Sequence, residues 1–272
     1  MKLNINLTDR VKTAIVGLPL LVLGAIFLPM AVWGVLTGLL AALAAWEIIC
    51  VAIREVTPVE IATALLAAFL IPFVTGLGAG WMLPALIAFL AVAVLLCELV
   101  LAIGADRPRR LDALCVIFFA GVMLPMIFSF LPGMDRLEGG WRCLLLVFVA
   151  AYGSDTGAWA AGKLFGRHKL LEPVSPNKTI EGAIGGLVLA MVFCVVYGLF
   201  VHAQIGWMVL YGFVGSLGAQ IGDLCFSAIK RIVGVKDFSD FLPGHGGILD
   251  RFDSVLFTAP LLYLLYSITV AF

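Results

Sequence analysis

The sequence contains few charged residues. Of its 272 residues only 12% are Asp, Glu, Lys or Arg, whereas 63% are apolar and the mean hydropathy is +1.14. Soluble domains carry about 25% charged residues. This scarcity excludes an ordinary soluble domain and predicts an integral membrane protein. The formal net charge is zero, so the charge balance indicates no particular partner, and no nucleic-acid partner is expected.

Paired cysteines and clustered histidines are also lacking. The six cysteines form no Cys-x-x-Cys pair and all lie in apolar segments, which disfavours a disulfide framework and favours buried free thiols. The only histidines are His168, His202 and His245, and none has a second His or Cys at metal-binding spacing. A zinc site is therefore not expected.

No internal repeat, low-complexity tract or linker for a soluble domain is evident. The missing repeat argues against a secondary transporter. Carboxylates inside apolar segments keep that alternative open, namely Glu47, Glu98, Asp155 and Asp223. No small-residue cleavage site follows the basic N-terminus, so an anchored start is expected and not a removed signal peptide.

Long apolar segments fill most of the chain. At about 20 residues per span, the pattern predicts an all-α polytopic membrane protein with about nine transmembrane helices. The expected segments are 13–30, 32–52, 59–77, 81–104, 111–131, 141–162, 180–203, 207–229 and 249–272. With nine spans, all 17 Lys and Arg residues except Arg136 and Arg142 fall on one side. This bias predicts a cytoplasmic N-terminus, an external C-terminus and a site facing the cytoplasm, in what we expect to be a bacterial inner membrane.

Ionisable residues concentrate between Ser227 and Asp253. No other stretch of this length carries as many, and cations beside carboxylates suggest phosphate and metal together. The alternative is a cytoplasmic loop whose charges are merely solvated. The ionisable residues are Lys230, Arg231, Lys236, Asp237, Asp240, His245, Asp250, Arg251 and Asp253.

The order of residues in this stretch favours the phosphate and metal interpretation. If the last helix begins near Ile248, Asp250 and Asp253 share the face of its first turn. Carboxylates suit Mg²⁺, which takes one or two of them together with substrate phosphates. The preceding turn contains Gly246 and Gly247, whose amides can approach an anion closely.

The same stretch resembles phosphatidate cytidylyltransferases, also called CDP-diacylglycerol synthases. The shared pattern is Ser-x-apolar-Lys-Arg, four residues, Lys-Asp, then Pro-x-His-Gly-Gly-apolar-x-Asp-Arg-apolar-Asp. Every fixed position is filled, by Ser227, Lys230, Arg231, Lys236, Asp237, Pro243, His245, Gly246, Gly247, Asp250, Arg251 and Asp253. The resemblance implies that CTP and phosphatidate give CDP-diacylglycerol and diphosphate. It also implies Mg²⁺, with a possible second, monovalent cation.

Two earlier segments extend the resemblance back to Tyr152. One is the Asp-x-Gly-Ala pattern starting at Asp155, and the other is Ser-Pro-x-Lys-Thr starting at Ser175. Pro176 after Ser175 also suits a helix start. Asn177 stands where the family is expected to vary, so we give it little weight.

The eighth span carries a polar face. Gln220, Asp223, Ser227 and Lys230 follow helical spacing. An unpaired Asp223 in lipid would be costly, so it should point into the bundle towards a partner or metal. The family resemblance then lets Asp223 and Asp250 bracket one Mg²⁺, with Asp253 a third ligand or an orienting group. In the alternative interpretation these carboxylates only pair with Arg231 and Arg251.

The implied site lies in the second half of the chain. We expect residues 1–140 to form a scaffold that contacts lipid and residues 141–272 to form the catalytic region. The implied catalytic residues are Asp223, Asp250, Asp253, Lys230, Arg231 and Arg251. The implied substrate-binding residues are Asp155, Ser175, Lys178, Ser227, Lys236, His245, Gly246 and Gly247.

Besides both substrates, the expected partners are membrane lipids and a second copy of the chain. A CTP-dependent lipid-alcohol kinase remains an alternative. It would release CDP and form a phospholipid, whereas the transferase releases diphosphate and forms a CDP-lipid.

Overall fold

The computed structural model describes residues 19, 21–53, 56–104, 111–239 and 246–269. Within these residues the chain is mostly helical, and seven helices are long and apolar enough to cross a membrane. Of the expected first span, 13–30, residues 13–18 and 20 lie outside the described residues, and residues 21–27 are helical. The helix α4 spans Met82–Gly104, and its apolar segment Met82–Cys97 is shorter than these seven helices.

The chain folds as two compact units. One comprises Met1–Asp135 with Asp237–Leu249, and the other Arg136–Lys236 with Asp250–Phe272. The division near residue 136 lies close to the boundary expected at 140. However, the segment Asp237–Leu249 belongs to the first unit, although it lies within the range 141–272.

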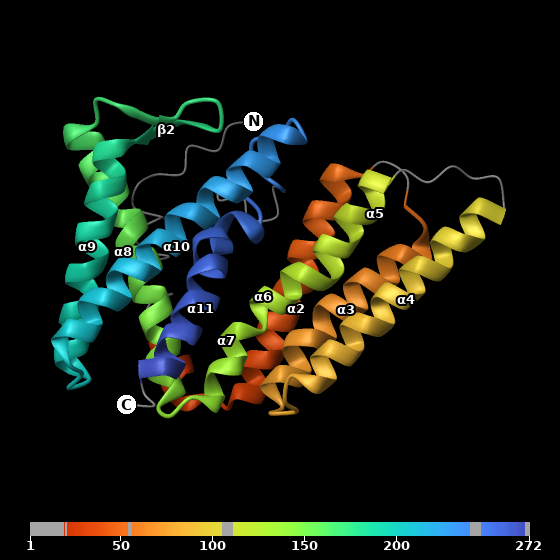
Figure 1. Ribbon diagram of the computed structural model, residues 1–272, viewed down its shortest axis with the longest axis horizontal. Helices are drawn as coiled ribbons and strands as arrows, with labels where there is room; N and C mark the ends of the chain where they lie inside the picture. Colours follow the sequence, from red (N-terminus) through yellow and green to blue (C-terminus); the bar gives the residue numbers. More distant parts are fainter. Residues whose placement is uncertain (1–18, 20, 54–55, 105–110, 240–245, 270–272) are drawn as a thin grey trace. The chain divides into compact units, whose positions relative to one another are not determined.

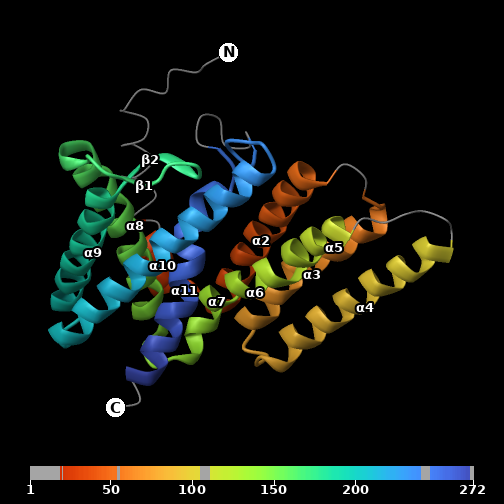
Figure 2. The same cartoon turned by 45° about the horizontal axis from the view of Figure 1, so that its top comes forward.

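Small side chains bring the helices of the first unit together. α3 (Pro58–Gly76) packs against both α2 (Met30–Ala52) and α4, as Figure 2 shows. The facing surfaces of α2 and α3 are rich in fully buried alanines, which allow close approach of two backbones.

α3 starts with a capping box, in which the Thr57 hydroxyl accepts a hydrogen bond from the Glu60 amide and the Glu60 carboxylate accepts one from the Thr57 amide.

The remaining span of the first unit is an interrupted helix. It runs through α5 (Leu111–Phe118), the π-helical turn η1 (Phe119–Met123), α6 (Leu124–Phe128) and α7 (Phe130–Gly133). The short 3-10 turn η2 (Met134–Arg136) follows. Pro125 is the second residue after the π turn, and its missing amide N–H disturbs the regular helical hydrogen bonds.

The second unit contains α8 (Gly140–Phe165), α9 (Ile180–Phe200), α10 (Ile205–Ile232) and α11 (Leu249–Thr269). α8, α9 and α10 pack side by side in Figure 1. The small residues expected around Asp155 do permit a close crossing. A Cβ added to Gly157 of α8 would lie 2.5 Å from the Gly185 carbonyl oxygen of α9.

A short antiparallel hairpin interrupts the all-α architecture. β1 (Lys169–Leu171) pairs with β2 (Ser175–Thr179) between α8 and α9. The helix start predicted at Pro176 is therefore wrong, because Pro176 lies inside β2. In a two-stranded sheet each strand is an edge, where a proline without an N–H is tolerated. α9 instead begins at Ile180, and the Thr179 hydroxyl accepts from the Gly182 amide.

One side of α9 is an apolar stripe. Ile184, Val188, Val192 and Val196 follow one another at four-residue spacing and are all exposed. Exposed apolar side chains on one helix face are what a lipid-facing surface requires.

All six cysteines are free, as expected, but only Cys143 and Cys194 are buried, so the expectation of buried thiols is wrong for the other four.

Candidate active site

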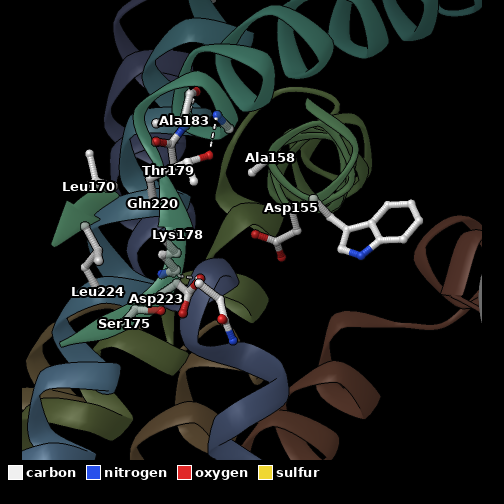
Figure 3. A pocket seen from close by; sticks show the side chains of 13 residues that line it. Asp155, Ala158, Leu170, Ser175, Lys178, Thr179, Ala183, Gln220, Asp223 and Leu224 are labelled. Carbon is white, nitrogen blue, oxygen red and sulfur yellow. Dashed lines mark hydrogen bonds and ion pairs between the residues drawn. The ribbon is translucent and has the colours of Figure 1, made fainter. Parts of the chain in front are cut away.

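A cavity of about 330 Å³ lies within the second unit, lined by α8, the hairpin, α9 and α10 (Figure 3). Most of its wall is apolar, from Leu170, Leu224 and Trp159 among others. Its polar groups face one another across the space. They come from Asp155, Ser175, Asn177, Lys178, Thr179, Gln220 and Asp223.

Lys178 and Asp223 form the ion pair of this cavity. The Lys178 Nζ lies 2.5 Å from the Asp223 Oδ2. The contact lacks hydrogen-bond geometry, and the buried Nζ has no hydrogen-bond partner in the described part of the chain. β2 thus aims an ammonium group with unused donors at a carboxylate on α10. The other Asp223 oxygen, Oδ1, accepts from the Ser227 hydroxyl at 3.3 Å.

Asp155 and Asp253 approach each other through a shared hydroxyl. The Ser254 Oγ lies 3.2 Å from the Asp155 Oδ1 and 3.4 Å from the Asp253 Oδ1. Both carboxylates are also electrostatically repelled by Asp223. Three carboxylates from α8, α10 and α11 therefore lie within reach of one another, which is a concentration of negative charge that favours a bound cation.

Close packing of α10 on α11 creates this proximity. A Cβ added to Gly222 would lie 2.4 Å from the carbonyl oxygen of Asp253. Only glycine allows the two backbones to come so near. The neighbouring Asp223 and the Asp253 side chain are brought together as a result.

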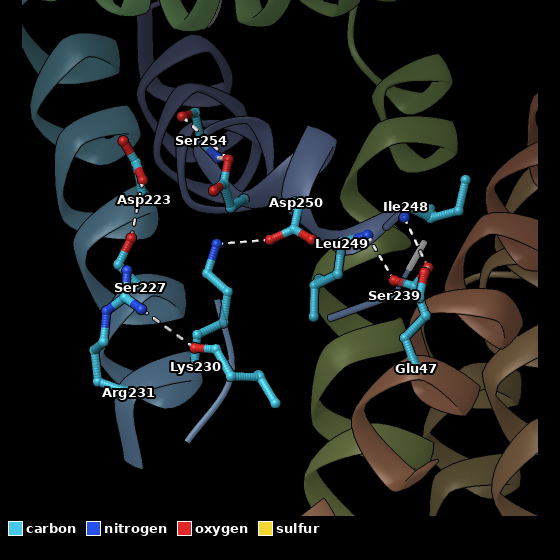
Figure 4. Close-up of polar contacts among 12 residues, drawn as sticks. Glu47, Asp223, Ser227, Lys230, Arg231, Ser239, Ile248, Leu249, Asp250 and Ser254 are labelled. Carbon is cyan, nitrogen blue, oxygen red and sulfur yellow. Dashed lines mark hydrogen bonds and ion pairs between the residues drawn. The ribbon is translucent and has the colours of Figure 1, made fainter. Parts of the chain in front are cut away.

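Lys230 and Asp250 form a second, more buried ion pair. Their Nζ and Oδ1 atoms lie 2.6 Å apart, and the side chains are only 11% and 6% exposed (Figure 4). Lys230 is one helical turn beyond Ser227 on α10, and Asp250 lies in the first turn of α11. The polar face predicted for residues 220, 223, 227 and 230 thus carries both pairs.

Arg231 binds two backbone carbonyl groups. Arg231 Nε donates to the Val174 carbonyl and its Nη1 donates to the Val235 carbonyl, which ties α10 to the hairpin. Lys178 lies next to Asp223 and Lys230 next to Asp250, so each of these aspartates has a lysine partner. Pairing of the carboxylates with Arg231 or Arg251 stays a prediction. Arg251 and Lys236 are exposed.

Three predicted residues belong to the segment Asp237–Leu249 of the first unit. His245 lies outside the described residues. Gly246 has φ +78°, and Gly247 is buried beside the Glu47 carboxylate. An anion contact by any of these three residues stays a prediction.

No three carboxylates form a ready metal cage. Across the part of the chain that the structure describes, no group of three or more His, Cys, Asp or Glu side chains is placed to hold a metal ion by itself. Fewer than three protein ligands is the arrangement that suits a Mg²⁺ ion sharing substrate phosphates.

Three residues of the site were not anticipated. Ser254 bridges two aspartates, Asn177 lines the cavity although it was given little weight, and Trp159 contributes an exposed ring to the wall. The Lys163 ammonium makes a cation–π contact with Trp159, with its Nζ 5.1 Å from the ring centre. The only feature of the sequence that points to these three residues is that they lie within or beside the motifs shared with the cytidylyltransferases.

Comparison with known proteins agrees with these motifs. The cytidylyltransferase family profile matches residues 8–269. Phosphatidate cytidylyltransferases from Staphylococcus epidermidis and Staphylococcus aureus are each 42% identical over 155 residues, and that from Staphylococcus saprophyticus is 41% identical. Each alignment covers 56% of this chain and 58% of the relative's length. Because the family profile covers nearly the whole sequence, the chain belongs to the cytidylyltransferase family.

Proposed function

We propose that this protein transfers a cytidylyl group from CTP to phosphatidate, giving CDP-diacylglycerol and diphosphate in phospholipid synthesis. The observation that carries this proposal is the cavity in which Lys178 and Asp223 meet. It places a cation with unused donors beside a cluster of carboxylates. The names of the staphylococcal relatives support the same reaction.

The residues suit the chemistry of two anions. CTP and phosphatidate repel each other, so catalysis depends on positioning them and neutralising their phosphates. Lys178, Lys230, Arg231 and Arg251 supply the positive charge. The phosphatidate oxygen attacks the α-phosphorus in line, diphosphate leaves from the opposite side, and no covalent enzyme intermediate is required.

Lys178 is the group that we expect to change partner. In the cavity its ion-pair partner is Asp223, and Asp155 also attracts its charge. A bound phosphate would offer oxygen acceptors to the unused N–H donors. A cation at Asp223 would at the same time replace Lys178 as the counter-charge, so substrate and cation binding would favour each other.

The donor set fits Mg²⁺. Asp223 and Asp250 would hold it, with Asp253 as an orienting group and substrate phosphates completing the coordination. When bound, the ion would offset charge on the diphosphate leaving group. A second, monovalent cation stays a prediction from the family resemblance.

The membrane arrangement is also part of the proposal. Nine spans, a cytoplasmic N-terminus and an external C-terminus would place the cavity at the cytoplasmic face of the inner membrane, where CTP is available. The exposed apolar helix faces would then contact membrane lipids, and a second copy of the chain could cover one of them. Sideways entry would let the diacyl tail of phosphatidate stay in lipid.

Product identity tests the reaction. Purified protein in detergent is incubated with Mg²⁺ and CTP labelled in the cytosine ring, in one sample with phosphatidate and in another with diacylglycerol as the lipid alcohol. We expect the label to enter the lipid extract with no ion gradient present. Label remaining in soluble CDP, with a phosphorylated lipid alcohol as product, would indicate the kinase. Absence of CTP turnover would contradict both enzymes.

A further inference from the structure

Glu47 of α2 is a buried carboxylate whose two oxygens are both occupied. Its side chain is 5% exposed. Oε1 accepts from the Ser239 hydroxyl at 2.6 Å and from the Ile248 amide at 2.8 Å, and Oε2 accepts from the Leu249 amide at 3.0 Å (Figure 4). These contacts all lie within the first unit. They join residues about 200 positions apart in the sequence.

The two amides belong to the start of α11. The first N–H groups of a helix have no partner within the helix and carry partial positive charge. A carboxylate is the side chain that best satisfies both needs. Here it comes from a different helix, so Glu47 acts as a cap for α11 although it is remote in sequence.

Gly247 leaves the space that this cap requires. A Cβ added at Gly247 would lie 2.6 and 2.7 Å from the two Glu47 carboxylate oxygens. Any other residue would displace the carboxylate or the backbone. Gly247, two residues before α11, and Glu47 of α2 therefore form the cap together.

We propose that Glu47 is a positioning residue for the cytidylyl transfer. Leu249, whose amide it binds, is covalently joined to Asp250, and Asp253 follows one turn later on the same helix. By fixing where α11 begins and how its first turn is oriented, Glu47 sets the direction of these two carboxylates. The kinetic part of this inference rests on the proposed function.

Glu47→Gln tests the inference at nearly constant volume. Gln offers one acceptor oxygen, and its amide group faces an N–H donor, so one helix amide loses its partner. We expect kcat to fall at least tenfold, with the KM for phosphatidate changed less than threefold, since misplacement of about 1 Å can cost about a hundredfold. Exchange of the Ile248 and Leu249 amides with deuterium should become faster.

Glu60→Gln is the matched control. Glu60 is also buried in the first unit, at 2% exposed, and its carboxylate also accepts a helix-start amide, that of Thr57. It caps α3, which carries none of the predicted site residues. We expect similar thermal destabilisation in both variants but loss of kcat only in Glu47→Gln. If the folded fractions of both variants have equal kcat, Glu47 is only a structural cap and the proposal is overturned.

A second pair of variants decides the matter if Glu47→Gln does not fold. Gly247→Ala should lower kcat by pushing the carboxylate away. Adding Glu47→Asp shortens the side chain and makes room for the new methyl group, so the double variant should regain at least threefold in kcat. No recovery would overturn the proposal. If the wild-type protein makes no CDP-lipid, the proposed function fails. Deuterium exchange of the Ile248 and Leu249 amides still tests the cap in that case. Unchanged exchange in a folded Glu47 or Gly247 variant would overturn the capping role of Glu47.

Discussion

Two ion pairs dominate the site at the scale of single residues, and they differ in burial. Lys178 and Asp223 meet in a cavity that is open to ligands, whereas Lys230 and Asp250 are nearly enclosed. A partly exposed pair can exchange partners at small cost. A buried pair is expensive to break, because removing one member leaves an uncompensated charge. The first pair therefore suits a change of partner when substrate binds, and the second also joins α10 to the first turn of α11.

Lys178→Met should remove phosphate binding while keeping the length of the side chain. We expect kcat/KM for CTP to fall at least tenfold, which is about 1.4 kcal/mol of transition-state stabilisation. Steady-state kinetics measure it. Arg142→Met is the control, because Arg142 is an exposed cation near the other end of the neighbouring helix α8. Equal effects of the two substitutions would argue against a specific role for Lys178.

Lys230→Met should destabilise the folded protein by about 3–5 kcal/mol, because it breaks the buried ion pair with Asp250. Replacing both residues, as Lys230→Met with Asp250→Leu, should restore much of the melting temperature without restoring activity. Thermal unfolding in detergent and turnover are measured together. A double variant that melts no higher than the single one would show that the pair is not the source of the stability.

At the scale of helices and strands, close helix crossings determine where these side chains meet. α10 approaches α11 at Gly222, and α8 approaches α9 at Gly157. The hairpin then brings Lys178 over α10, and Arg231 fastens the hairpin through the Val174 carbonyl. The carboxylates and cations of the site thus depend on small residues that carry no chemistry themselves.

Gly222→Ala should damage the site from the helix interface. The added methyl group would lie 2.4 Å from the Asp253 carbonyl oxygen, so α11 must shift. Overpacking of this kind costs about 1–3 kcal/mol, and turnover should fall with it. Gly206→Ala on the same helix is the control, because its Cβ would have no neighbour within 4 Å. Normal activity and stability of Gly222→Ala would contradict the close crossing.

Local patterns predicted some of these elements and missed others. Helical spacing placed Asp223, Ser227 and Lys230 on one face, and α11 begins one residue from the expected Ile248. The hairpin was missed because Pro176 fits a helix start as well as an edge strand. The role of Glu47 could not be read locally either, because its partners lie about 200 residues away and donate through backbone amides. Long-range contacts of that kind leave no periodic signal.

At the scale of the whole molecule, the proposed nine spans would place 15 of the 17 Lys and Arg residues on one side of the membrane. The hydropathy pattern predicted the spans from α2 onwards to within a few residues, because helix length is fixed by the thickness of the bilayer. It could not predict that Asp237–Leu249 packs with the N-terminal unit. That assignment depends on hydrogen bonds to Glu47, which hydropathy does not register.

Cysteine labelling tests the orientation. In a variant without the native cysteines, Glu172→Cys lies in the hairpin turn and Ala203→Cys in the turn between α9 and α10. α9 separates the two positions, so an impermeant thiol reagent applied to intact cells should label only Ala203→Cys. Glu172→Cys should become labelled after permeabilisation. Labelling of the hairpin from outside would reverse the proposed topology.

The central claim is that the cavity at Asp223 is where the cytidylyl group is transferred. The most direct measurement is the initial rate at which the α-phosphorus label of CTP enters lipid, for wild-type protein and Asp223→Asn at saturating Mg²⁺. Asn keeps the shape of Asp and loses its charge. We predict at least a hundredfold lower rate in the variant, about 2.7 kcal/mol, with a melting temperature within a few degrees of wild type. Transfer at the wild-type rate by Asp223→Asn would contradict the account.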